Sequence, residues 1–189
     1  EALQDLLAGS GDDRWIRTAV FTSLSTEASD AFLSLAASRN NSTHSATVAL
    51  IDLADLVARQ TSEETGWGKI AAVVAGRKDD PAMQVKLLQA VFRANKTAQS
   101  SPSFSQLSAE LLKSARTSVA DASLSENLRA AALTTFSLSS YTQDGELLLG
   151  SLESAQPPVV QNAALATLLQ FPDEQVARQL LDRWPGLSP

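Results

Sequence analysis

Four segments of this chain repeat one apolar pattern, and the repetition limits the fold more than any other feature. They begin at Asp12, Asp79, Leu124 and Gln156 and read DDRWIRTAVFTSL, DDPAMQVKLLQAVF, LSENLRAAALTTF and QPPVVQNAALATLL. When the segments are aligned on Arg17, apolar residues recur three and four positions apart, which places them along one face of an α-helix. The apolar columns are Ile16, Met83, Leu128 and Val160; Phe21, Leu88, Leu133 and Leu165; and Leu24, Val91, Phe136 and Leu168.

Residues that favour the start of a helix precede each segment. An aspartate or serine can cap the first turn, and a proline suits the first helical position. These residues are Asp12 and Asp13, Asp80 with Pro81, Ser125 with Glu126, and Pro157 with Pro158. We therefore expect a helix to begin at each of the four places.

The spacing of the repeats predicts the architecture. Arg129 and Gln161 are 161 − 129 = 32 positions apart, while Arg17 and Gln84 are 84 − 17 = 67 apart, about two such steps. A weaker copy begins at Ala46, in the gap between the first two segments. Second helices are expected between the copies, over 27–39, 62–77, 103–121, 144–154 and 173–184. Repeats of this length with two helices are typical of an α-solenoid, in which neighbouring pairs bury each other's apolar faces.

The sequence thus predicts an all-α fold: a HEAT/armadillo-like α-α superhelix of about five helix pairs. We expect residues 1–189 to form a single repeat domain, and we expect that domain to be a piece of a larger protein. No segment alternates apolar and polar residues long enough to predict a strand. No apolar run approaches the ~20 residues needed to span a bilayer, so we expect no direct membrane insertion.

Composition excludes several kinds of site. The 189 residues include no cysteine, so disulfides, thiolate metal ligands and a cysteine nucleophile are absent. The formal net charge is −6 and the 15 Lys and Arg residues are dispersed along the chain. Because nucleic-acid affinity comes largely from basic residues that neutralise phosphates, we expect no nucleic-acid partner.

Two stretches resemble a known family. DDRWIRTAVFTSL resembles the motif helix of HEAT-like repeats, in which an acidic start leads into a V-R-x-A-A-x-x-L helix. QPPVVQNAALATLLQFPDEQVARQLLDRWPGLSP resembles the HEAT-repeat region of large planctomycete-type bacterial proteins, described as membrane-bound dehydrogenase or haem-binding multidomain proteins. The resemblance is anchored at the two ends of the chain and is looser from Ala46 to Lys113.

The resemblance implies a function for the segment within a larger protein. Proteins of this family are similar to exported redox proteins, with a propeller dehydrogenase-like module before the repeats and a c-type cytochrome module after them. Neither module lies in these 189 residues, so no catalytic, cofactor-binding or metal-ligating residue is carried over, and no cofactor is expected in the chain. The resemblance implies a scaffold between the modules, in an exported or periplasmic protein, with those flanking domains as partners.

A second hypothesis is an independent protein–protein interaction solenoid that binds a partner on its concave face. An enzyme is the third and weakest hypothesis. A HEAT-like DNA glycosylase would need a basic groove, and a bilin lyase would need a ligand-holding constellation. The sequence indicates neither, so we expect no enzymatic activity.

One aligned column carries the most informative polar residues: Arg17, Gln84, Arg129 and Gln161. In HEAT-like repeats an arginine in this column typically bridges to an acidic turn residue of the same or the adjacent repeat. Resemblance therefore favours a structural role, with Asp12 or Asp13 as partner of Arg17, and Asp121 or Glu126 as partner of Arg129. The alternative is that the column forms a partner-binding surface.

Each of the three tryptophans is a candidate interface anchor, because tryptophan is enriched in binding hot spots. Trp15 and Trp184 match positions of the family pattern, which favours packing. Trp67, in the sequence GWG, fits no pattern and is the best candidate for an exposed side chain. The candidate interaction surface is therefore Trp67, Arg17, Gln84, Arg129 and Gln161.

The remaining polar residues give no further site. His44 is the one histidine and is expected in an exposed polar loop, without the partners that a metal or a hydrolytic site needs. Asp52 and Asp55 lie three apart on one expected helix and are interpreted as part of a solvated face.

Overall fold

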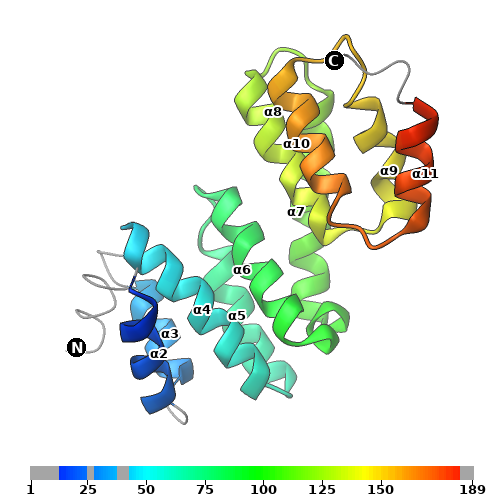
Figure 1. The fold of residues 1–189 in the computed structure, drawn as a ribbon. Helices are drawn as coiled ribbons and strands as arrows, with labels where there is room; N and C mark the ends of the chain where they lie inside the picture. The colour runs from blue at the N-terminus through cyan, green and yellow to red at the C-terminus, as the bar shows by residue number, and fades with distance from the viewer. Residues whose placement is uncertain (1–12, 25–27, 38–42, 184–189) are drawn as a thin grey trace. The chain divides into compact units, whose positions relative to one another are not determined.

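The structure is a computed structural model that describes residues 13–24, 28–37 and 43–183. Within these ranges the chain forms ten α-helices, two short 3₁₀-helices and no strand, which confirms the all-α prediction (Figure 1). The elements are α2 (Arg14–Ser23), α3 (Ala28–Ala37), α4 (His44–Gln60), α5 (Glu64–Ala75), α6 (Pro81–Ala94), η1 (Lys96–Ser100), α7 (Pro102–Ala120), α8 (Glu126–Thr134), η2 (Thr135–Leu138), α9 (Tyr141–Gly150), α10 (Pro158–Leu168) and α11 (Glu174–Arg183).

The helix starts predicted from the sequence are present where the structure describes them. Oδ1 of Asp13 accepts hydrogen bonds from the backbone nitrogens of Trp15 (2.8 Å) and Ile16 (3.3 Å). Asp80 caps α6 in the same way, and Pro81 occupies its first turn. The hydroxyl of Ser125 caps α8. These side chains satisfy backbone N–H groups that the first turn of a helix leaves without partners.

The chain packs as two compact units, residues 1–107 and residues 108–189. The prediction of a single repeat domain over residues 1–189 stays a prediction.

In the first unit, α4 is the most extensively packed helix. It packs most extensively against α6 and next against α3, and it also contacts α2, while α3 contacts α5 (Figure 1). Two of the predicted motif helices, α4 and α6, therefore pack directly against each other. The core of this unit contains an aromatic cluster. The ring of Phe104 packs edge-on against the ring of Trp67, with centroids 5.9 Å apart, and against the ring of Phe92, with centroids 5.8 Å apart.

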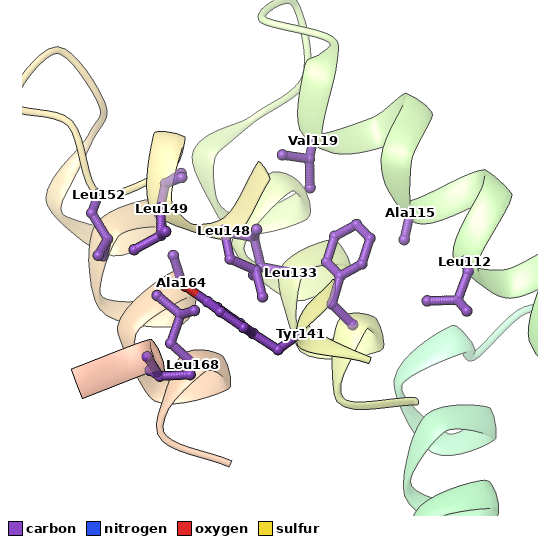
Figure 2. Close-up of a cluster of buried hydrophobic side chains, with 13 residues drawn as sticks. Leu112, Ala115, Val119, Leu133, Tyr141, Leu148, Leu149, Leu152, Ala164 and Leu168 are labelled. Carbon is purple, nitrogen blue, oxygen red and sulfur yellow. The ribbon is translucent and has the colours of Figure 1, made fainter. Parts of the chain in front are cut away.

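In the second unit, α8 packs most extensively against α10, and α9 contacts both α10 and α11. Figure 2 shows their shared apolar cluster, to which α7 contributes Leu112, Ala115 and Val119. Leu133 of α8 and Leu168 of α10 are fully buried in it.

Helix α9 begins at Tyr141, three residues before the start expected from Asp144. Asp144 does not cap this helix, because its carboxylate is held by side chains from outside α9. The glycine that follows has a packing role. A Cβ atom at Gly145 would lie 2.6 Å from the ring of Tyr141, one turn earlier, so only glycine leaves room for that ring.

Candidate functional site

The aligned polar column has a structural role in three of its four positions. Nε2 of Gln84 donates to the carbonyl of Val74 (2.9 Å), near the end of α5. Nε of Arg129 donates to the carbonyl of Val119 (3.2 Å), near the end of α7. Each side chain reaches back to the helix that precedes its own. Carbonyls in the last turn of a helix have no helical partner, so these side chains supply donors there.

Gln161 also donates to a backbone carbonyl that precedes its own helix, but that carbonyl lies in a turn and not in the preceding helix. Its Nε2 donates to the carbonyl of Glu153 (2.8 Å), in the turn after α9. The common requirement of the column is therefore a side-chain N–H donor, which both arginine and glutamine provide. This explains why the column alternates between a charged and a neutral residue.

Arg17 makes a different contact, with the next motif helix. Its Nε lies 2.9 Å from Oδ2 of Asp52 on α4. The Asp13 carboxylate named as a candidate partner caps α2, and Asp12 lies outside the described residues. The ion pair therefore joins α2 to α4.

The acidic partners expected for Arg129 are replaced mainly by neutral acceptors. Nη2 of Arg129 donates to Oε1 of Gln156 (2.8 Å), in addition to the bond to Val119. Asp121 accepts from the side chain and backbone of Ser123, and these bonds, with a smaller contribution from the charge of Arg129, lower the pKa of Asp121. The interaction of Asp121 with Arg129 is therefore a longer-range electrostatic attraction and not a direct hydrogen bond.

Two tryptophan predictions are wrong, in opposite directions. Trp67, the candidate for exposure, is 4% exposed and lies in the aromatic cluster of the first unit. Trp15, expected to pack, is 82% exposed on α2. Trp184 lies outside the described residues. Trp67 and Gln84 are therefore removed from the candidate interaction surface, because both are buried.

Ion pairs connect the motif helices of the first unit. Asp55 of α4 accepts from Arg59 on its own helix (2.7 Å) and from Arg93 of α6 (3.3 Å). Together with the Arg17–Asp52 pair, the Arg93–Asp55 pair links α4 to both α2 and α6. Asp52 and Asp55, predicted as members of a solvated face, are used as links between helices.

A buried ion pair in the second unit was missed by the sequence analysis. Nε and Nη2 of Arg116 donate to the two carboxylate oxygens of Asp144, at 2.7 Å and 2.8 Å. The Ser139 hydroxyl donates to the same carboxylate. Burial acts to raise the pKa of Asp144, but the hydrogen bonds from Arg116 and Ser139 and the charge of Arg116 outweigh it and lower the pKa. No spacing rule links residues 28 apart on different helices.

A carboxylate also joins α5 to the start of α7. Glu64 accepts from the hydroxyls of Ser101 (3.0 Å) and Ser103 (2.6 Å). Hydrogen bonds from Ser103 and then Ser101 lower the pKa of Glu64. This carboxylate therefore links α5 to the segment at the start of α7 through two serine hydroxyls.

A hollow of about 430 Å³ lies at the ends of α3 and α5. Two of its charged lining residues are bonded within the fold: Arg77 donates to the carbonyl of Ala36, and Asp80 caps α6. The third, Asp79, is exposed.

The other residues considered as ligands are not brought together. His44 is exposed, as expected, although it lies in the first turn of α4 and not in a loop. Across residues 13–24, 28–37 and 43–183, no group of three or more His, Asp or Glu side chains is placed to hold a metal ion. Nor does any helix in these ranges combine the length and apolar character required to cross a membrane.

Comparison with known proteins gives no match: no family model, no curated protein and no solved structure is significantly similar to the chain.

If the polar column is structural, replacing Gln84 with leucine will destabilise the protein. We expect the free energy of unfolding to fall by about 1 kcal/mol, because a buried hydrogen bond to the Val74 carbonyl is lost. Urea unfolding followed by circular dichroism measures this change. Gln170→Leu is the matched control, since its amide makes only a long, exposed bond to Ala166, and it should change stability by less than ~0.5 kcal/mol. Equal effects of the two substitutions would contradict the structural role.

Proposed function

We propose that this chain is a non-catalytic scaffold of stacked HEAT-like helix pairs. In this proposal its job is to hold flanking modules at a fixed spacing and orientation. The observation that carries it is the regular distance in sequence between residues that bond across helices. Arg17 bonds to Asp52 over 35 residues, and Arg93 to Asp55 over 38.

The same interval recurs in the second unit. The hydroxyl of Thr167 donates to the carbonyl of Leu133 over 34 residues, and the hydroxyl of Tyr141 donates to Gln179 over 38. These four contacts span 34 to 38 residues, close to one repeat, and they run from motif helix to motif helix and from second helix to second helix. Such contacts are expected in a solenoid, in which each repeat contacts its neighbours. This supports the HEAT-like superhelix as the arrangement of the helix pairs.

The polar groups support a structural role. Arg116 and Asp144, Glu64 and its two serines, and the donors of the polar column are all satisfied by contacts within the fold. A catalytic group must instead reach a substrate, and it usually has an open side. The identity of the modules rests on the resemblance alone: a propeller dehydrogenase-like module before the repeats, a c-type cytochrome module after them, and an exported or periplasmic location.

The alternative, an independent solenoid that binds a partner on its motif-helix face, has less support. A dedicated binder would be expected to carry a contiguous apolar or aromatic patch on that face. In the first unit the motif helices carry ion pairs that the helices share, centred on Asp52 and Asp55, and the exposed aromatic side chain on them is Trp15 of α2.

The purified chain tests the proposal. We expect a strongly helical circular dichroism spectrum, a colourless preparation and no hydrolase or lyase turnover. Metal analysis and absorption spectroscopy are the measurements. A stoichiometric visible absorption band, or turnover that purifies with the chain, would overturn the proposal of a non-catalytic scaffold.

A further inference from the structure

Helix α10 has apolar residues on two opposite faces. One face is buried against its neighbours and includes Val160, Ala164 and Leu168, all 0% exposed. At 100° per residue, Val159 and the C-cap residue Leu169 lie about 140° from the centre of that face, and Leu165 lies about 100° from it. Val159, Leu165 and Leu169 are 43%, 39% and 71% exposed. A helix that is apolar on both sides is usually buried on both sides.

The surface formed by Val159 and Leu165 of α10, together with Leu169 at the C-cap of that helix, is called the terminal face below. Helix α11 carries a separate exposed leucine, Leu181, on the side away from α9. Its other side faces α9, where Gln179 bonds to Tyr141 and Arg183 to Glu146.

The repeat alignment indicates what covers the terminal face. Leu165 is in the same column as Leu133, which is fully buried in the cluster that α8 shares with α10. Helix α10 packs on α8, where Thr167 bonds to the carbonyl of Leu133. Leu165 is thus the equivalent of a residue that is buried against the next motif helix, yet it is itself 39% exposed.

We propose that the terminal face binds one further helix pair of this repeat type. The first helix of that pair would present to α10 the apolar stripe that α10 presents to α8. The occupant is expected to be uncharged at its centre, because α10 itself (PVVQNAALATL) has no charged residue. This inference rests on the proposed helix-pair scaffold and continues its interface between adjacent repeats.

An added repeat tests this proposal. Residues 156–183 are copied and appended after Leu187, in place of Ser188 and Pro189, so that each copied residue follows its original by 32 positions, the spacing of Arg129 and Gln161. Backbone amide exchange of α10 is then measured in the 189-residue chain and in the extended chain. We expect exchange in α10 to slow about 100-fold or more, because Leu165 and Leu169 are removed from water.

Matched substitutions in the extended chain identify the surface responsible. Leu165→Ser with Leu169→Ser should abolish the added protection. Leu128→Ser, at an exposed leucine of α8, should leave it intact. Unchanged exchange in α10 although the copy is helical, or protection that survives the double substitution, would overturn the proposal.

Self-association is tested in the parent chain. A dimer in sedimentation experiments that the same double substitution abolishes would mean that a second copy occupies the face, which would also overturn the proposal. Failure of the added repeat to bind leaves the scaffold itself intact, because the scaffold is tested separately by the spectra and turnover of the unmodified chain.

Discussion

Replacing Arg116 with alanine is expected to lower the free energy of unfolding of the second unit by about 3 kcal/mol, because it leaves a buried carboxylate without its partner. Asp144 is 3% exposed and accepts two hydrogen bonds from the Arg116 guanidinium. The value is placed at the low end for buried pairs, since the Arg116 side chain is 44% exposed and water can partly replace it. Urea unfolding measures the change.

Arg178→Ala is the matched control, because it also removes an arginine from an ion pair. Arg178 and Glu174 are both exposed, so the expected loss is only ~0.3–0.5 kcal/mol. A loss below ~1 kcal/mol for Arg116→Ala would contradict a stabilising role of the buried pair.

Acid should also lower the stability of the parent protein. The pKa of Asp144 is lower in the folded state than its ordinary value of 3.8, so the folded state holds the proton more weakly than the unfolded state. Its contribution is therefore complete above the ordinary pKa and is lost as the pH falls through the lower folded value. This acid-dependent loss should be smaller in Arg116→Ala.

The second large effect is expected from Phe104→Ala in the first unit. Phe104 is fully buried and contacts the rings of Trp67 and Phe92 edge-on. Its removal leaves a cavity and two aromatic rings without their partner, at a cost of about 4 kcal/mol. Thermal and urea unfolding, followed by circular dichroism, measure the loss.

Two controls separate the cavity from other effects. Phe104→Leu keeps most of the volume and should cost less than ~1.5 kcal/mol. Trp15→Ala removes a larger side chain, but one that is 82% exposed, and should change stability by ~0.5 kcal/mol or less. Equal effects of Phe104→Ala and Trp15→Ala would contradict the claim that Phe104 stabilises the first unit as part of a buried aromatic core.

Helix positions were predictable because their signals are local. The three- and four-residue apolar spacing and the caps at Asp13, Asp80 and Ser125 act within one or two turns, and all three residues cap helices. The start of α9 was misplaced at Asp144. Aspartate is a common helix cap, but this carboxylate bonds to Arg116 on α7, and the helix begins at Tyr141.

The candidate surface was harder to predict, because exposure depends on which helix packs where. The local sequence favoured packing for Trp15 and exposure for Trp67, yet Trp67 is buried against Phe104, 37 residues further along the chain, and Trp15 is exposed. A signal for the terminal face did exist in the sequence. Val159, Leu165 and Leu169 make α10 apolar on both sides, which only a two-sided packing arrangement would require.

The central claim is that these helix pairs hold other modules of one polypeptide in place. The native reading frame on both sides of Glu1 and Pro189 tests it most directly. We expect a signal peptide and a propeller module upstream, and a further helix pair followed by a C-x-x-C-H cytochrome motif downstream. A start codon next to Glu1 and a stop codon next to Pro189 would contradict the scaffold and define a free-standing protein.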